Sequence, residues 1–214
     1  MQIALTLNRS WDEELLRTAH LHPAGAPALL LTWRPDPWPV DGGIPAPLRT
    51  PLAGALAGLG ILAFPLLRPP EPPVPTLEMV PVPPQSSFAR LAARLAHHPN
   101  RPLALARDEA GVCTFLDQAW DSQSAAGLLL EPAATADAAS LAALRERADW
   151  QDWPLRPPVV ALIAPPVDGC GLFAAGRDEA ALARLADRLA ATLAAAGFPL
   201  EPSALPEGSP AGLP

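Results

Sequence analysis

The chain has 214 residues, and half of them are hydrophobic, so it can bury a sizeable core. Thirty residues are proline, nearly three times the usual frequency of about 5 %, which argues against a regular helical bundle or a long uninterrupted sheet. The net charge is −7, and all 15 basic residues are dispersed arginines. This composition excludes Schiff-base and P-loop chemistry, which need lysine, and disfavours nucleic-acid binding.

Strands and a helix are predicted to alternate in the N-terminal part, residues 1–64. Apolar runs predict strands at 2–7 and 27–33. Between them, Ser10 is a typical helix N-cap residue and begins a predicted helix at 10–20. No basic segment followed by an apolar run opens the chain, so a signal peptide is not expected.

An apolar segment, residues 51–67, lies at the end of this part. No charged residue stands between Arg49 and Arg68, and the run is just short of the length that crosses a bilayer. Gly60 and Pro65 limit a good helix within it to about a dozen residues. We therefore expect the segment to be buried in this protein or covered by a partner, with membrane insertion as the alternative.

Proline-rich sequence predicts the main break in the chain. The run from Pro65 to Pro84 is so rich in proline that we expect an extended linker over 65–85, with a short strand at 77–80. The tail, 198–214, is rich in proline, glycine and serine and has little hydrophobic periodicity. We expect this tail to be mostly disordered.

The segment between these breaks, residues 86–197, is predicted to form an α/β core. Its predicted helices are 86–97, 138–147 and 178–196, and its predicted strands are 102–107, 111–117, 157–164 and 170–175. Turns that combine an acidic residue with glycine predict two antiparallel hairpins packed under the helices. With the N-terminal part, this indicates a mixed α+β fold of helix–strand units joined by proline-rich connections.

The helix at 178–196 has the clearest pattern in the chain. Asp178 and Glu179 lie in its first turn, where the helix dipole favours acids, and Gly197 is placed to end it. Its leucines recur at spacings of three and four and form one stripe: Leu182, Leu185, Leu189 and Leu193. We expect this stripe to cover one face of the sheet.

Cysteine and histidine spacing gives little support for a metal centre. Cys113 and Cys170 belong to no CxxC motif, which favours reduced cysteines with a core role in an intracellular protein; a single disulfide between them is the alternative. The only metal candidates are weak, two histidine pairs at predicted helix ends, where the helix dipole also favours histidine: His20, His22, His97 and His98. We expect no cofactor.

Two tryptophan clusters are the most distinctive candidates for a binding surface. In the first, prolines stiffen a stretch of mixed apolar and charged residues, Trp33, Arg34, Asp36 and Trp38. The second consists of Trp150 and Trp153. Tryptophan and arginine are favoured at the centres of protein interfaces, so we expect partner contacts here. The alternative is that the indole rings fold back into the core.

Two short stretches resemble known families. Residues 159–196 are similar to the closing strand–hairpin–helix of GAF-like and roadblock-like domains, in which a sheet backed by helices binds small molecules or partner proteins. The pattern WDExL at 11–15 with LTxxP at 31–35 is similar to a fragment of bacterial N-acetylglucosaminyltransferase-type enzymes. Those enzymes carry an acidic metal-binding motif just upstream, where this chain has QIALTLN, without an acid. Neither resemblance covers enough of the chain to assign a family.

We expect a non-catalytic, cytoplasmic accessory or scaffold protein that acts through protein–protein contacts; its arginine, alanine and proline usage is typical of GC-rich bacterial genes. The sequence has no complete catalytic motif but much rigid, apolar, proline-stiffened sequence, and this favours binding. Two alternatives stay open. One is an enzyme, as a degenerate sugar-nucleotide-type transferase, and the other is a peripheral membrane protein held by residues 52–64. Whether a small molecule binds is also open.

Overall fold

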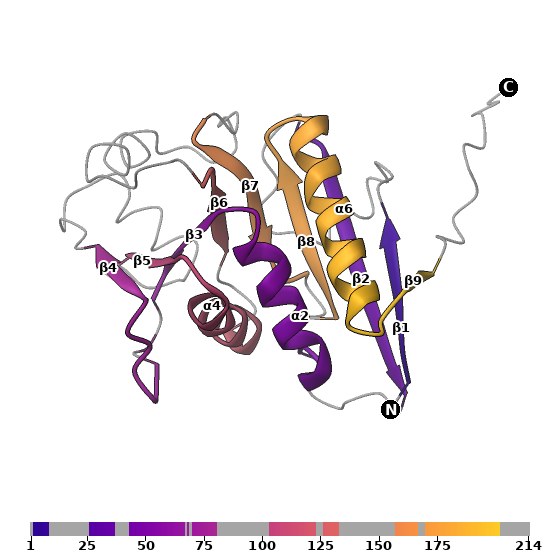
Figure 1. Ribbon diagram of the computed structural model, residues 1–214, viewed down its shortest axis with the longest axis horizontal. Coiled ribbons are helices and arrows are strands. Elements are labelled where there is room, and N and C mark those ends of the chain that lie inside the picture. The colour runs from indigo at the N-terminus through magenta and orange to yellow at the C-terminus, as the bar shows by residue number, and fades with distance from the viewer. Residues whose placement is uncertain are drawn as a thin grey trace, which may run out of the picture.

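The computed structural model shows one nine-stranded sheet with helices packed against it (Figure 1). It describes residues 2–8, 26–36, 43–66, 68, 70–80, 103–122, 126–132, 157–166 and 170–201. The strand order is β4-β5-β3-β6-β7-β8-β2-β1-β9, and every neighbouring pair is antiparallel except the parallel pair β1 and β9. The mixed α+β fold predicted from the sequence is confirmed.

The strands are two to nine residues long. They are β1 Gln2–Asn8, β2 Ala28–Asp36, β3 Ile61–Pro65, β4 Glu78–Val80, β5 Leu103–Ala106, β6 Gly127–Leu130, β7 Val159–Ala164, β8 Gly171–Gly176 and β9 Leu200–Glu201. Strand β2 pairs with β1 on one side and with β8 on the other, so residues 28–32 lie beside residues 171–175. One sheet therefore includes strands from both ends of the chain.

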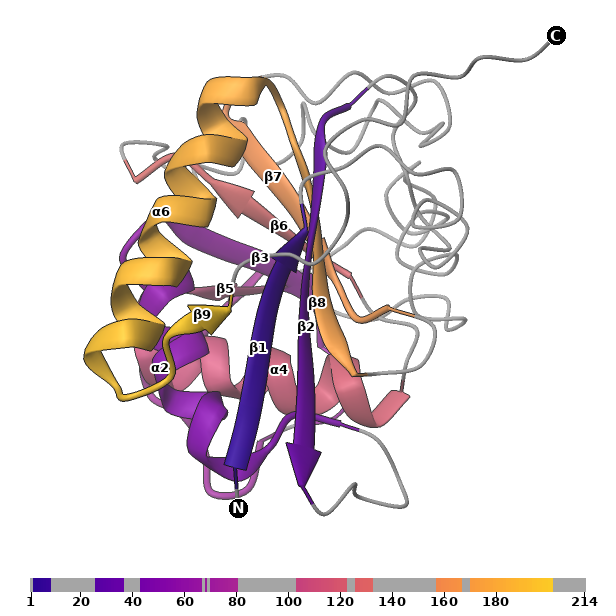
Figure 2. The same cartoon turned by 90° about the vertical axis from the view of Figure 1, so that its right-hand side faces the viewer.

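The described helices are α2 Ala46–Ala57, α4 Glu109–Ser122 and α6 Glu179–Ala195. All three contribute to a single hydrophobic cluster with one face of the sheet, and α2 contacts both α4 and α6. Figure 2 shows α2 and α6 on the same side of the strands. The three helices thus form a layer over that face.

The opposite face of the sheet is apolar and buried as well. Side chains alternate between the two faces of a strand, and the residues that alternate with the helix-facing set are also shielded from solvent. They include Leu30, Ala63, Leu105, Leu128, Leu162 and Phe173. All six residues of β7 and all six of β8 are buried. Burial on both faces explains why these strands are continuous apolar runs rather than alternating ones.

Most predicted strands and the last helix are confirmed where the structure describes them. The strands predicted at 2–7, 27–33, 102–107, 157–164 and 170–175 correspond to β1, β2, β5, β7 and β8, and β7 and β8 pair as an antiparallel hairpin. In α6 the predicted leucine stripe is buried. Asp178 caps this helix by accepting a hydrogen bond from the backbone N–H of Ala181, and Gly197 follows it with a positive φ of 87°.

The strand predicted at 111–117 is wrong, because these residues belong to helix α4. Asp108 accepts a hydrogen bond from the N–H of Gly111 as a helix cap does, so the acidic residue and glycine begin a helix rather than a hairpin turn. The buried residues of α4 follow helical spacing: Val112, Phe115, Leu116 and Ala119. The hairpin predicted over 102–117 is therefore absent, and β5 pairs instead with β3 and β4.

The apolar segment 51–67 contains the end of a helix and a complete strand. Residues 51–57 complete α2, and residues 61–65 form β3, an interior strand between β5 and β6. The side chains of Leu52, Leu56, Leu62 and Phe64 are at most 1 % exposed. The large apolar side chains of residues 52–64 are therefore buried in this protein, which agrees with the first expectation rather than with membrane insertion. No helix in the described part of the chain is long and apolar enough to cross a membrane.

Several predictions lie outside the described residues. These are the helices predicted at 10–20, 86–97 and 138–147, and most of the tail at 198–214. Of the tail, residues 198–201 are described, and Leu200–Glu201 form β9. Within the proline-rich stretch 65–85, the short strand predicted at 77–80 is present as β4. Three described strands, β3, β6 and β9, were not predicted.

Candidate binding pocket

A pocket of about 620 Å³ opens between α2, α4 and the proline-rich segment that follows β3. We call residues 66–77 the arm, of which 66, 68 and 70–77 are described. The pocket is lined by Arg49, Arg68, Pro70, Glu71, Pro72, Val74, Ala110, Cys113, Thr114, Asp117 and Gln118. Its volume is within the range usual for ligand sites.

The side chain of Gln118 fastens the arm to α4. Its amide nitrogen donates to the carbonyl oxygen of Arg68 at 2.7 Å, and its amide oxygen accepts from the N–H of Arg68 at 3.2 Å. The Arg68 guanidinium also pairs with Asp121 on α4 at 2.6 Å, at a position exposed to solvent. Because Gln118 is 4 % exposed, its two bonds hold the arm far more firmly than the exposed ion pair does.

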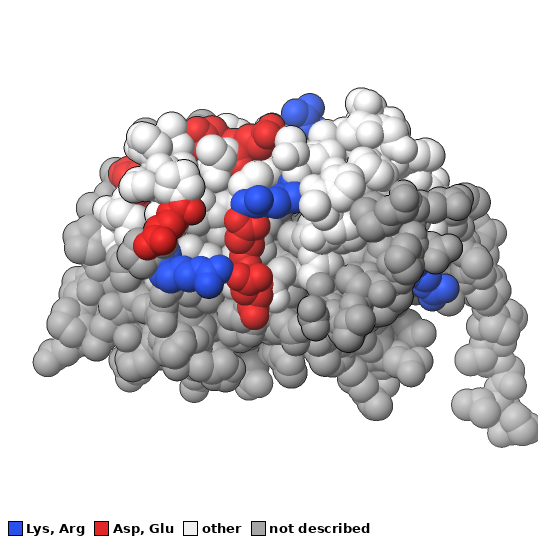
Figure 3. All heavy atoms as spheres, turned by 90° about the horizontal axis from the view of Figure 1, so that it is seen from below, with Lys and Arg blue, Asp and Glu red and all other residues white. Residues whose placement is uncertain are grey.

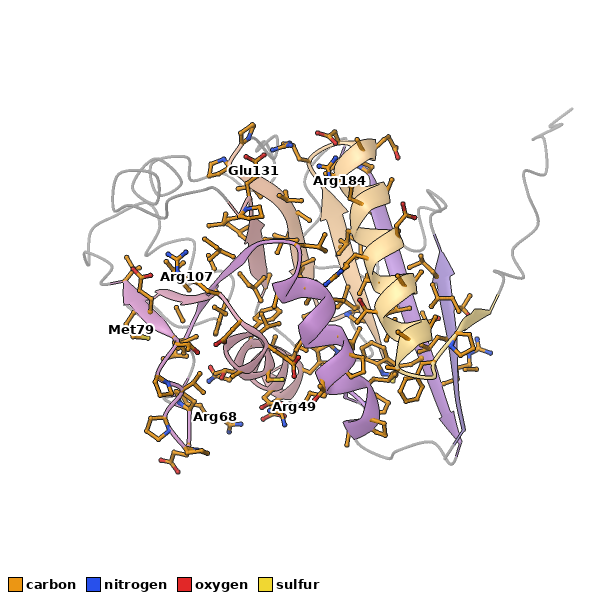
Figure 4. The ribbon with its side chains drawn as sticks, in the orientation of Figure 1. Arg49, Arg68, Met79, Arg107, Glu131 and Arg184 are labelled. Atoms are coloured by element: carbon orange, nitrogen blue, oxygen red, sulfur yellow. The ribbon has the colours of Figure 1, made fainter. Side chains whose placement is uncertain are left out.

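A second ion pair joins α2 to α4 inside the pocket. Arg49 donates to the carboxylate of Asp117. Burial raises the pKa of Asp117 above its ordinary value, although the neighbouring Arg49 acts in the opposite direction. Figure 4 shows that Arg49 and Arg68, from different elements, lie at the same lower end of the molecule. Figure 3 looks onto this end, where acidic and basic side chains are interleaved.

Cys113 lies on the pocket-facing side of α4 and is half-buried. Burial raises the pKa of its thiol, Arg49 lowers it, and the carboxylates of Asp117, Glu109 and Asp108 raise it further. A nucleophilic cysteine needs the opposite environment, one that lowers its pKa. The thiol is therefore protonated at neutral pH, and the pocket does not activate it as a nucleophile.

The structure places Trp33 in the core. It is 1 % exposed, its indole N–H donates to the carbonyl of Gly43 at 2.9 Å, and its ring lies 6.3 Å from that of Trp120. Of the two alternatives for this ring, folding back into the core is therefore the observed one. Arg34, its neighbour on β2, is exposed, and Asp36 is the last residue of that strand.

The other predicted site residues lie outside the described part of the chain. These are Trp38, Trp150, Trp153 and the histidines His20, His22, His97 and His98. Among the described residues there is no group of three or more histidine, cysteine, aspartate or glutamate side chains that could hold a metal ion. Of the predicted partner-binding residues whose side chains the structure describes, Trp33 and Arg34, neither lines the pocket.

Sequence reasoning missed the pocket residues, although one signal was present. The tetrapeptide Arg-Asp-Glu-Ala occurs twice, at 107–110 and 177–180, each time directly after a strand and at the start of a helix. In both copies the aspartate accepts a hydrogen bond from the backbone N–H three residues later. By comparison with the helix predicted at 178–196, this repeat would have predicted a helix that begins next to Asp108.

No protein-family model, curated protein or solved structure matches this chain.

Proposed function

We propose that this protein is a non-catalytic accessory or scaffold protein that binds a segment of a partner protein in the pocket between α2, α4 and the arm. The proposal moves the expected partner contact away from Trp33, which is in the core. It places the contact on described residues that surround a cavity.

One observation carries the proposal: the shape of the pocket is fixed, while the carboxylate of Asp117 is engaged and the thiol of Cys113 is not activated. Asp117 is held by Arg49, and Cys113 has a raised pKa. Gln118 locks the arm in place through both the nitrogen and the oxygen of its side-chain amide. A preformed wall lowers the entropic cost of binding, and protected side chains supply contacts rather than chemistry.

The arm adds a second argument, from its composition. Pro70 and Pro72 line the pocket together with Val74. Proline rings present rigid apolar surface that loses no side-chain freedom when a partner binds. These residues suit recognition of a segment with an apolar component, and they offer no general acid, base or nucleophile.

A matched pair of substitutions tests the proposal. Ala110 and Ala180 are both exposed, and each is the second residue of its helix, after the same Arg-Asp-Glu. Only Ala110 lines the pocket. Ala110→Trp should fill the pocket, whereas Ala180→Trp adds the same ring to an exposed site on α6.

The measurement is affinity purification of the tagged full chain from the cells that make it, at low salt, with mass spectrometry of co-eluting proteins. We expect a stoichiometric protein with the wild type and with Ala180→Trp, reduced at least tenfold with Ala110→Trp. The proposal fails if Ala110→Trp, folded by circular dichroism, retains every partner, or if no variant retains any.

A further inference from the structure

The charged residues that line the pocket balance one another. Among the described residues, two arginines, Arg49 and Arg68, stand against two carboxylates, Glu71 and Asp117. A site without net charge gives no advantage to an ion of either sign, and a charged ligand would lose part of its hydration on entering. The pocket therefore favours a neutral group.

Arg49 nevertheless keeps part of its hydrogen-bonding capacity unused. One terminal nitrogen of its guanidinium donates to Asp117, but its Nε is buried and has no hydrogen-bond partner. An oxygen atom of a ligand cannot reach a buried nitrogen. The positive charge of a guanidinium is delocalised over its plane, however, so a group that acts on the whole plane can compensate it.

The face of an aromatic ring acts on a guanidinium in this way. The ring has a negative face and a positive edge but no net charge, so it attracts a cation and leaves the charge balance of the pocket unchanged. Arginine makes this contact more often than lysine does, because its plane also stacks on the ring. Arg68, whose side chain is 66 % exposed, provides a second guanidinium in the pocket lining.

The apolar part of the wall also suits an aromatic ring. Pro70, Pro72 and Val74 line the pocket from the arm. Proline packs well against aromatic rings, and grooves lined with aromatic side chains recognise proline-rich segments in this way. Within the described part of the chain, no aromatic residue lines the pocket. The pocket thus presents residues that commonly surround an aromatic ring, without the ring itself.

We propose that the pocket binds an aromatic side chain of the partner segment, a tryptophan, tyrosine or phenylalanine, against the guanidinium groups and the prolines. This inference rests on the proposed function and names the chemistry that the site selects. A free aromatic molecule shares that chemistry, and the test separates the two sources.

The test is calorimetry on the purified full chain with four blocked tripeptides, in which phenylalanine, cyclohexylalanine, arginine or glutamate stands between two alanines, and with benzyl alcohol. Cyclohexylalanine has nearly the size of phenylalanine but no π face. We expect the phenylalanine peptide to bind about two- to fivefold more tightly than the cyclohexylalanine peptide, the range for an exposed cation–π contact. A phenylalanine peptide that binds more tightly than benzyl alcohol indicates a polypeptide source, and the reverse order indicates a free aromatic molecule; either order supports the aromatic site.

Two arginine variants locate the ring. Arg49→Lys keeps a cation beside Asp117 but removes the planar group, and Arg68→Met removes the second guanidinium. Arg68 holds Gln118 through its backbone, so Arg68→Met leaves those two hydrogen bonds in place. At least one variant should weaken the phenylalanine peptide about two- to fivefold and leave the affinity of the cyclohexylalanine peptide unchanged.

Arg107→Met is the control for these variants. Arg107 is 45 % exposed and pairs with Glu78, as Arg68 pairs with Asp121, but it does not line the pocket. This control should leave the affinity of both peptides unchanged.

The inference is overturned if the cyclohexylalanine, arginine or glutamate peptide binds as tightly as the phenylalanine peptide, or if no aromatic probe binds at millimolar concentration. It is also overturned if neither pocket variant weakens the phenylalanine peptide, or if Arg107→Met weakens it as much as they do. Should these probes fail while Ala110→Trp still removes a protein partner, the proposed function stands and only the aromatic assignment is lost. Failure of both experiments removes the pocket as a binding site.

Discussion

Gly58 and Gly60 lie two residues apart at the end of α2, but a side chain at each would meet different neighbours. A Cβ atom at Gly60 would lie 1.9 Å from the carbonyl oxygen of Leu130, which belongs to the backbone of β6. At Gly58 the nearest atom would be the guanidinium of Arg188 at 2.4 Å, the end of an exposed, flexible side chain. Gly60 therefore permits the close packing of the chain between α2 and β3 against β6, and Gly58 has no such role.

Gly60→Ala should lower the free energy of unfolding by at least about 2 kcal/mol, because β3 must move away from its partner strand. Gly58→Ala should change it by no more than about 0.5 kcal/mol, since Arg188 can swing aside and the backbone at Gly58 is already helical. Urea denaturation of the two variants and the wild type measures the difference. Equal effects of the two substitutions would contradict this account of the glycines.

The Cys113 thiol gives a pH-dependent readout at the scale of one residue. Its folded pKa is raised above the ordinary value of 9.0 by burial and by nearby carboxylates. Iodoacetamide should therefore modify Cys113 with a pH midpoint above 9.0, while Cys170, 6 % exposed, should react only on unfolding.

The raised pKa of Cys113 also makes the free energy of unfolding depend on pH. Because the folded pKa lies above the unfolded one, the stability contributed by the protonated thiol is present below pH 9.0 and lost as pH rises toward the folded value. Cys113→Ser should remove this part of the alkaline loss. A midpoint below 9.0 for Cys113 would contradict the environment described for the pocket.

At the scale of the elements, the arginines of the two Arg-Asp-Glu-Ala segments differ in their exposure and in their hydrogen-bond partners. Arg177 is 18 % exposed and bonds to Glu131 at 2.6 Å, to Asp178 at 3.2 Å and to the carbonyl of Val159 at 3.3 Å. These bonds tie the ends of β6 and β8 to the start of β7 and α6. The first copy, Arg107, is 45 % exposed and, within the described part of the chain, its side chain pairs with Glu78 at 3.1 Å.

Arg177→Lys should therefore cost about 1.5–3 kcal/mol of unfolding free energy, because an ammonium group cannot reproduce the forked geometry of the guanidinium. Arg107→Lys should cost less than about 0.5 kcal/mol, as expected for an exposed ion pair. Chemical denaturation of both variants checks the prediction. A larger loss from Arg107→Lys would show that the exposed pair at the sheet edge is the more important one.

How far an element could be predicted depended on whether local pattern or long-range contact defines it. Helix α6 is specified locally by its Asp178 cap and its leucine stripe. In α4 the glycine at 111 resembled a turn residue, but a Cβ there would lie 2.8 Å from the Cβ of Ala106, so the glycine permits close approach of helix and strand. Strands β3 and β6 are short apolar runs, which periodicity cannot separate from buried helix.

At the scale of the whole molecule, the sheet order determines where the pocket forms. The arm runs from β3 to β4, and β5 pairs with both of these strands. Strand β3 runs antiparallel to β5, so the arm leaves β3 beside the first residue of β5, and the later turns of α4, at Gln118 and Asp121, return to meet it there. The contact between residues 68 and 118 could not be predicted from the sequence, because it is the order of the strands in the sheet that brings these two residues together. The pocket is thus a product of tertiary structure, whereas the mixed α+β class was predictable.

The most direct test of the central claim, that the partner occupies this pocket, is the rate of Cys113 alkylation in the purified complex and in the free protein. Cys113 lines the pocket and is half-buried, so a bound segment must cover it. We predict at least a tenfold slower reaction in the complex at equal pH, restored when the partner is displaced by salt. An unchanged rate of Cys113 modification in an intact complex would place the partner elsewhere on the molecule and contradict the account.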